Sequence, residues 1–412
     1  MDAGDDTVVV RRRRVFYIPG YDPFHPRRYR ELYRTEGTAQ AAISGFSLAL
    51  KPKPRGKTYG WLVDAVIEGQ AVQADVDVLV WSDIVRDSMS RSIPATYAQL
   101  LRTAWTYIGS GALLRLMRLR KGPVIAALYP VGMLLAQLVA AVLLGLLVVT
   151  LAGLIPVAGA LASAVAAAGW GAGVAVAVAV LRWFKRRDGK LYAHYLMHDY
   201  AFSARWNGAN PPALEARMTA FGDRIAAALA SDVDEVLVVG HSSGAHLGVS
   251  ILADLHRAGR VPQQGPQLSF LSLGQVVPMM SFLPDAKRLR RDLHALSTTD
   301  MAWVDITAPG DGCAFALCDP VAVSGVAPPD ARWPLVISAA FTQTLSPERW
   351  TALRWKFLRL HFQYLCAFDR PRDYDYFRVT AGPLTLGYRY RDRAPSASRI
   401  ATPTSGHVDM GA

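Results

Sequence analysis

The chain has 412 residues, a formal net charge of +12 and 51% hydrophobic residues, a high apolar content for a wholly soluble protein. The charge suits solubility or contact with an anionic membrane surface. No zinc-finger spacing, aromatic RNA-binding motif or helix-turn-helix pattern indicates a nucleic-acid partner. Three cysteines are too few for a disulfide framework, and the N-terminal sequence MDAGDDTVVVRRRR lacks the apolar stretch of a signal peptide.

The N-terminal part of the chain alternates β-rich and helical patterns. Arg13 to Pro19 is predicted to form a strand, which ends in a sharp loop at Gly20 to Pro23 and is followed by a helix. Further elements are predicted downstream, namely strands at Tyr59 to Gly69 and Asp77 to Trp81 and a helix at Ser92 to Leu119.

The middle of the chain contains no Asp, Glu, Lys or Arg from Pro123 to Leu181. A membrane-spanning helix needs about 20 apolar residues. Two spans therefore fit, at about Ala127 to Thr150 and Ala160 to Leu181, and Gly153 and Pro156 supply a turn between them. This pattern predicts a transmembrane hairpin.

Basic residues flank this block on both sides: Arg115, Arg118, Arg120 and Lys121 before it, and Arg182, Lys185, Arg186 and Arg187 after it. The positive-inside rule places both flanks in the cytoplasm, typically at a bacterial-type inner membrane. Gly169 and Gly173 would let the two helices pack closely. Two alternatives remain open: a hairpin buried inside a soluble domain, and a second segment that is re-entrant.

Strands and helices alternate again after the block. Leu191 to Tyr200 is a segment of mixed aromatic and polar residues. The helices expected after it are Pro212 to Ala230, Gly244 to Ala258 and Lys287 to Leu296, and the strands expected between and after them are Glu235 to Val239, Gln267 to Leu273 and Met301 to Thr307. The alternation predicts an α/β fold with a mostly parallel sheet covered by helices on both faces. One discontinuous domain, 1–121 and 188–390, would then carry the hairpin 122–187 as an insertion and end in a disordered tail, 391–412.

The sequence Gly240-His241-Ser242-Ser243-Gly244 matches the pattern G-x-S-x-G. A β-rich run precedes it and a helical pattern follows, which is the strand–turn–helix setting that this motif requires. Small residues are needed at Gly240 and Gly244 because the serine backbone is strained in so tight a turn. A glycine turn of a phosphate-binding protein is the alternative, although no phosphate-loop motif stands here.

On these residues the chain resembles the α/β-hydrolase superfamily, in which a serine, an acid and a histidine follow one another along the chain. The resemblance implies an α/β-hydrolase-like fold with Ser242 as the nucleophile. It implies that the main-chain N–H of Ser243 is one donor to the oxyanion, and that the second comes from the loop after an early strand. Gly20 and Tyr21 fit that loop, with the N–H of Tyr21 as donor, although Pro19 stands where the family commonly has a histidine.

The acid and the histidine can then be sought beyond the motif. Asp311 lies in a loop after a predicted strand, where the superfamily places its acid, whereas Asp305 lies inside the strand and Asp319 is a reserve. Among later histidines, His407 lies in the predicted tail and His361 lies among aromatic residues that could orient it. We therefore expect the triad Ser242, Asp311 and His361, although the sequence around His361 also fits a helix instead of the superfamily's loop.

This triad predicts a membrane-anchored serine hydrolase that cleaves carboxylic esters, lipid esters included, through an acyl-enzyme and without a metal or organic cofactor. His194 and His198 have a spacing that could bind metal on a helix, but they lack the glutamate of a zinc-protease motif. The expected partners are the lipid bilayer and an acyl-ester substrate. A thioesterase or acyltransferase with the same triad, and a non-catalytic scaffold or receptor on this fold, are the alternatives.

Overall fold

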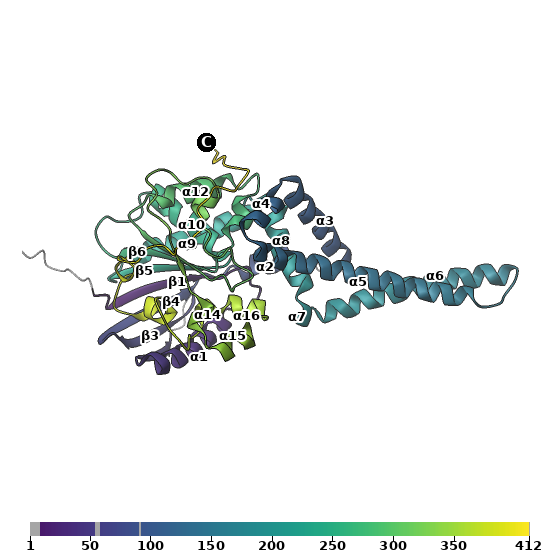
Figure 1. Ribbon diagram of the computed structural model, residues 1–412, viewed down its shortest axis with the longest axis horizontal. Coiled ribbons are helices and arrows are strands. Elements are labelled where there is room, and N and C mark those ends of the chain that lie inside the picture. Colours follow the sequence, from purple (N-terminus) through teal and green to yellow (C-terminus); the bar gives the residue numbers. More distant parts are fainter. Residues whose placement is uncertain (1–8, 54–57, 90–91, 412) are drawn as a thin grey trace, which may run out of the picture.

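The structure is a computed structural model that describes residues 9–53, 58–89 and 92–411. An α/β body carries one long helical hairpin that projects from it (Figure 1). Residues 1–8, part of the N-terminal sequence that lacks the apolar stretch of a signal peptide, lie outside the described residues.

A single eight-stranded sheet forms the centre of the body, in the order β2-β3-β4-β1-β5-β6-β7-β8. From β4 to β8 the neighbouring strands are parallel, whereas β2, β3 and β4 form an antiparallel meander at one edge. The strand bounds are β1 (Arg12–Ile18), β2 (Ser47–Pro52), β3 (Tyr59–Ile67), β4 (Gln70–Val78), β5 (Glu235–His241), β6 (Gln267–Leu273), β7 (Ala302–Thr307) and β8 (Leu335–Ser338). The expected α/β fold with a mostly parallel sheet is confirmed.

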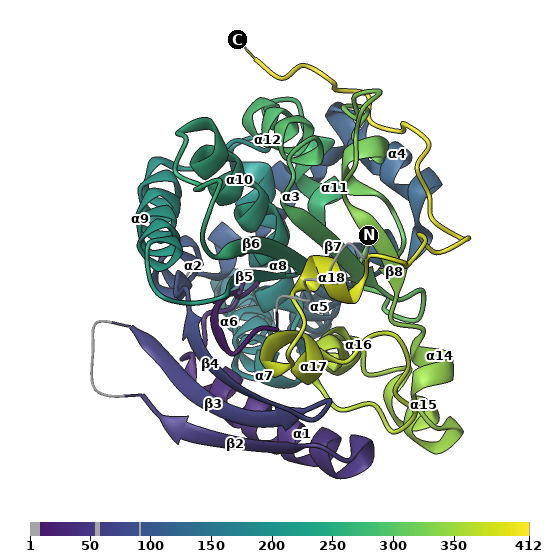
Figure 2. The same cartoon turned by 90° about the vertical axis from the view of Figure 1, so that its left-hand side faces the viewer.

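Helices cover both faces of the sheet. Figure 2 shows α9, α10 and α12 on one side and α1 and α17 on the other, and a separate apolar core fills each side. The helix bounds are α1 (Arg27–Ser44), α2 (Ser82–Ser88), α3 (Ile93–Gly109), α4 (Ala112–Leu119), α5 (Lys121–Gly153), α6 (Ala160–Arg186), α7 (Asp188–Leu191), α8 (Ala193–Arg205), α9 (Pro212–Leu229), α10 (Gly244–Arg257), α11 (Val277–Ser281), α12 (Lys287–Ser297), α13 (Pro320–Val323), α14 (Phe341–Thr344), α15 (Pro347–Leu353), α16 (Phe357–His361), η1 (Gln363–Leu365), α17 (Tyr376–Ala381) and α18 (Leu386–Arg389).

The central strands are buried on both faces, which explains their continuous apolar sequences. Every residue of β5 is buried, including Glu235 at its start. That carboxylate is satisfied because the Arg13 Nε donates to it over 2.6 Å from the neighbouring strand β1. The pair fixes the register of the two strands that lead to Gly20 and Ser242.

The uncharged block forms two antiparallel helices, α5 and α6, joined by residues 154–159 (Figure 1). Both are long and apolar enough to cross a membrane, and the most apolar 18-residue windows of the two helices have mean hydropathies of 2.7 and 2.1. Only 22% and 11% of their most apolar windows are buried by protein, so the alternative of a hairpin enclosed in the domain is wrong. Close contact of the two helices depends on glycine, since a Cβ at Gly173 would lie 2.7 Å from the Gly145 carbonyl oxygen.

Three local expectations differ from the structure. The single helix expected at Ser92 to Leu119 is interrupted, because Gly111 adopts a left-handed φ of 71° and separates α3 from α4. The strand expected at Asp77 to Trp81 is the end of β4, and Trp81 precedes α2. The segment Leu191 to Tyr200 belongs mostly to the helix α8.

The C-terminal residues expected to form a disordered tail, 391–412, follow the surface of the domain as far as they are described. The N–H of Ile400 donates to the Leu317 carbonyl over 2.7 Å, and the N–H of Ser396 donates to that of Val336 over 3.0 Å. Near the end, the Arg290 Nε donates to the Asp409 carbonyl over 2.7 Å. Backbone pairing of this kind leaves no signal in a Ser/Pro-rich composition, from which disorder was expected.

Candidate active site

Ser242 lies in the tight turn between β5 and α10, at the carboxyl edge of the sheet. Its φ of 55° is in the left-handed region, which is unusual for a residue other than glycine and is characteristic of strained functional positions. Two hydrogen bonds hold the backbone there, from the Ser242 N–H to the Leu273 carbonyl over 2.9 Å and from the Ala245 N–H to the Ser242 carbonyl over 3.0 Å. The hydroxyl thus projects from a rigid turn.

The three glycines expected to surround this turn all stand at close contacts. A Cβ at Gly240 would lie 2.7 Å from the Ala245 Cα, and one at Gly244 would lie 2.1 Å from the Ile18 carbonyl oxygen. A Cβ at Gly20 would lie 2.9 Å from the Ser242 Cβ. Any larger residue would push β1, β5 and α10 apart at the point where Ser242 is presented.

Asp311 and His361 meet in the same region, although they come from distant parts of the chain. Asp311 lies in the loop after β7, and its Oδ2 is 2.7 Å from the His361 Nδ1. The carboxylate also accepts hydrogen bonds from the Tyr364 hydroxyl, over 3.1 Å, and from the Cys313 N–H, over 2.9 Å. These three hydrogen bonds fix the position of the buried carboxylate.

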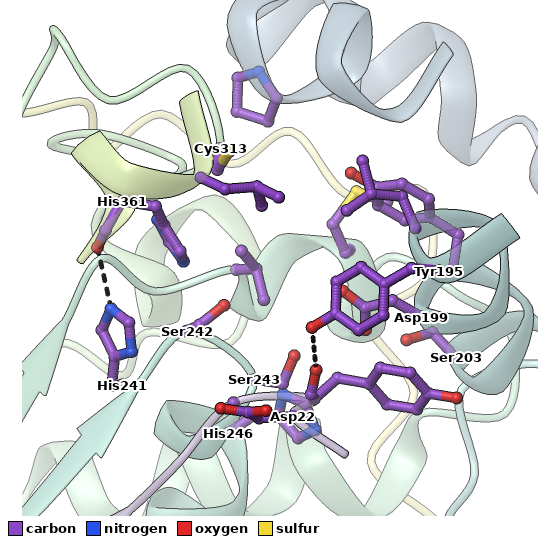
Figure 3. A pocket seen from close by; sticks show the side chains of 18 of the residues that line it. Asp22, Tyr195, Asp199, Ser203, His241, Ser242, Ser243, His246, Cys313 and His361 are labelled. Atoms are coloured by element: carbon purple, nitrogen blue, oxygen red, sulfur yellow. Dashed lines mark hydrogen bonds between the residues drawn. The ribbon is translucent and has the colours of Figure 1, made fainter. Parts of the chain in front are cut away.

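His361 is the last residue of the short helix α16, so the sequence pattern that suggested a helix was correct at this point. Its Nδ1 is engaged by Asp311, which leaves Nε2 available on the other side of the ring. Figure 3 shows the imidazole of His361 and the side chain of Ser242 facing the same pocket, and both line it. The structure therefore pairs Asp311 with His361 and places Ser242 in the same pocket as His361, although among the described residues the Ser242 hydroxyl makes no hydrogen bond to the imidazole.

Two main-chain N–H groups are available beside Ser242. Ile18 pairs with Gly240 in the β1–β5 register, which places the loop Pro19 to Tyr21 next to the turn. Within the described parts of the chain, neither the Tyr21 N–H nor the Ser243 N–H donates to another protein group. The loop is held by the Tyr195 hydroxyl, which donates to the Tyr21 carbonyl over 2.7 Å.

Two residues that sequence reasoning did not single out support the histidine. The Nε2 of His241 donates to the His361 carbonyl over 3.0 Å (Figure 3). Burial, with a smaller contribution from the charge of His361, lowers the pKa of His241 to about 3, so this ring is a neutral donor near pH 7. Tyr364 binds Asp311 and accepts from the Ala308 N–H over 3.0 Å. The position of His241 inside the G-x-S-x-G motif could have indicated that its side chain lies close to the site.

The alternative residues have other roles. Asp305 is buried in β7 and accepts from the Ser272 hydroxyl over 2.6 Å. Asp319 caps α13 by accepting from the Val321 N–H. His407 lies on the C-terminal segment, where its Nε2 is 3.4 Å from the Ser110 carbonyl.

Possible metal ligands overlap with the triad. Within the described residues, ligand atoms of Asp311, Cys313 and His361 lie within 4.8 Å of one another. Burial raises the pKa of the Cys313 thiol well above its ordinary value, which disfavours the thiolate that a metal requires. His198 on α8 is instead paired through Nδ1 with the Gln99 side chain, over 2.8 Å.

The pocket in front of Ser242 is lined by both apolar and polar side chains. Aromatic and apolar side chains predominate, among them Tyr21, Tyr195, Leu196, Tyr200, Met279 and Phe362. Pro123, from the first turn of the hairpin helix α5, also lines it. The pocket thus adjoins the point where the hairpin leaves the body.

Comparisons with protein-family models, with curated proteins and with solved structures found no match to this chain.

Proposed function

We propose that this chain is a membrane-anchored serine hydrolase with an α/β-hydrolase-like fold that cleaves carboxylic esters. One observation carries the proposal: Ser242, at a left-handed φ in a strand–helix turn, shares a pocket with an imidazole whose far nitrogen is bound by a buried aspartate. An orienting acid behind the histidine of a serine–histidine pair is the arrangement of serine nucleophiles in enzymes.

The mechanism follows from the positions of these groups. The Nε2 of neutral His361 removes the Ser242 proton as the hydroxyl attacks the ester carbonyl, and Asp311 stabilises the imidazolium that forms. The N–H groups of Tyr21 and Ser243 donate to the developing oxyanion. His361 then gives the proton to the leaving alcohol, and a water molecule releases the acyl group by the same route. No step requires a metal or organic cofactor.

The hairpin supports a lipid or other membrane-partitioning ester as substrate. Gly122 in the first turn of α5 lies beside Gly312, since a Cβ at Gly122 would be 3.6 Å from the Gly312 Cα. Gly312 in turn lies against Phe357, which is exposed together with Trp355. Pocket, hairpin base and exposed aromatic side chains therefore adjoin, as expected for a site that opens at the membrane interface.

Membrane contact has further support from α3, which exposes Leu101, Trp105 and Ile108. Trp105 is 78% exposed, an unusual position for tryptophan outside an interface. The basic flanks of the hairpin favour a cytoplasmic position for the body at a bacterial-type inner membrane. The proposed partners are thus the bilayer and an acyl-ester substrate, with no nucleic acid.

The proposal is tested by labelling detergent-solubilised protein with a fluorophosphonate probe. Wild type should be labelled, and Ser242→Ala should lose the label. Ser242→Ala should also hydrolyse p-nitrophenyl esters at least about 10⁴-fold more slowly than wild type. The control is Ser398→Ala, which removes an exposed serine from the C-terminal segment. Labelling that persists in Ser242→Ala would identify another nucleophile. A folded wild type that resists the probe would favour the non-catalytic scaffold or receptor.

A further inference from the structure

Asp199 is a carboxyl group in the pocket that the hydrolytic mechanism does not use. It belongs to α8 and lines the same pocket as Ser242 and His361 (Figure 3). Among the residues that the structure describes, the half-buried side chain of Asp199 makes no hydrogen bond or ion pair. The second aspartate of the pocket, Asp22, differs in this respect, because Arg28 and the Tyr29 hydroxyl both bind it.

The surroundings of Asp199 are aromatic. Tyr21, Tyr195 and Tyr200 line the pocket together with Asp199. Burial raises the pKa of these three hydroxyls and of the Tyr107 hydroxyl, and the charge of Asp199 raises each further. Three of the four tyrosines direct their hydroxyls elsewhere. Tyr195 binds the Tyr21 carbonyl, Tyr21 binds the Ser88 hydroxyl over 2.6 Å, and Tyr107 donates to the Met279 carbonyl over 3.0 Å.

A carboxylate without a counter-ion in such a pocket is unfavourable, because burial penalises its charged form. Burial accordingly raises the pKa of Asp199 to about 7, while the charge of His361 lowers it. His241 and His246, the other imidazoles of the pocket, have pKa values lowered by burial to about 3 and about 4 and are neutral near pH 7. The protein therefore supplies no permanent cation to this carboxylate.

We propose that Asp199 and the tyrosine rings around it form a subsite for a positively charged alkylammonium group on the ester substrate. A carboxylate gives the cation its charge partner, and aromatic faces attract alkylammonium groups through cation–π interaction. A neutral alcohol of the same shape would leave the carboxylate unpaired. This inference rests on the proposed function only in treating the pocket as the substrate site.

Binding to a catalytically silent protein tests the subsite independently of catalysis. The Ser242→Ala protein in detergent is titrated calorimetrically with choline and with its neutral isostere 3,3-dimethylbutan-1-ol. Choline should bind at least about 10-fold more tightly, a difference of about 1.4 kcal/mol. Equal binding of the two compounds would overturn the inference, whether or not the fluorophosphonate probe labels the wild type.

A second variant locates the effect. Adding Asp199→Asn should abolish the preference for choline, because the amide keeps the shape of the side chain and removes its charge. The matched control is Asp300→Asn, which removes one negative charge from an acid whose side chain is 95% exposed. Choline binding that survives Asp199→Asn, or that is lost equally in the control, would also overturn the inference. Hydrolysis of esters without choline binding would leave the proposed function standing alone.

Discussion

Two aspartates six positions apart, Asp305 and Asp311, show how the surroundings of a residue decide its role. Asp311 accepts from His361, Tyr364 and the Cys313 N–H, so both of its carboxylate oxygens have a hydrogen-bond partner. Asp305 accepts one hydrogen bond, from Ser272, and its Oδ2 has no partner among the described residues. Burial raises the pKa of Asp305 to about 8, so this side chain is a neutral acid near pH 7.

Replacing Asp305 by asparagine should change how stability depends on pH. The pKa of Asp305 rises from about 3.9 in the unfolded chain to about 8 in the folded protein. The folded state binds the extra proton, so its contribution to stability is full below about pH 4 and is lost as the pH rises through 8. Relative to wild type, Asp305→Asn should gain about 1.4 kcal/mol for each pH unit between pH 5 and 8.

Thermal unfolding of both proteins in detergent, measured from pH 5 to pH 9, checks this expectation. The difference between the two proteins isolates Asp305, because buried histidines such as His246 affect both equally. For His246 the pKa is lowered to about 4, so its contribution is lost as the pH falls below 6.5. A constant difference between the proteins across this range would show that Asp305 is ionised in the folded state.

At the scale of elements, the patterns that predicted best were long and continuous. The strand, turn and helix around Ser242 were expected at Glu235 to Ala258 and occur as β5 and α10. The edge strand β2, with the sequence SLALKP, was not foreseen because it has no continuous apolar run and lies largely exposed. The four-residue strand β8 is too short to carry a periodic signal.

In the candidate site, too, some residues could be predicted from the sequence and others could not. The grouping of Ser242, Asp311 and His361 could be predicted because the resemblance to the α/β-hydrolase superfamily implies an order of serine, acid and histidine along the chain. Tyr364 and Asp199 could not, since their relevance depends on α8 and the segment after α16 folding back on the pocket. Contacts between segments so far apart in the chain leave no periodic trace in either sequence.

The hairpin gives a test of one helix contact. A side chain at Gly173 would strike Gly145 of α5, whereas one at Gly171, on the same helix, meets nothing within 4 Å. Gly173→Leu should therefore separate α5 from α6 and destabilise the hairpin by about 1–3 kcal/mol. Gly171→Leu should have little effect. Melting temperatures in detergent compare the two variants, and equal values would contradict the packing of these helices through their glycines.

At the scale of the whole molecule, the hairpin leaves and re-enters the body at neighbouring points. Its first helix begins at Lys121 beside the pocket, and its second ends at Arg186, before α7 and α8 return to the pocket wall. Figure 1 shows the body on one side of this base and the joining turn at the far end. With basic residues at both ends of the hairpin, a bilayer would separate the turn from the pocket that Ser242 lines.

Single cysteines can test this topology in intact cells with a membrane-impermeant maleimide. Ala158 lies exposed in the turn and Ser398 lies exposed on the body. We expect Ala158→Cys to be labelled from outside and Ser398→Cys only after permeabilisation. The wild type measures any background from its native cysteines. An Ala158→Cys that reacts only after permeabilisation would indicate a re-entrant hairpin. A Ser398→Cys that reacts from outside would reverse the orientation and place the proposed ester hydrolysis on the other face of the membrane.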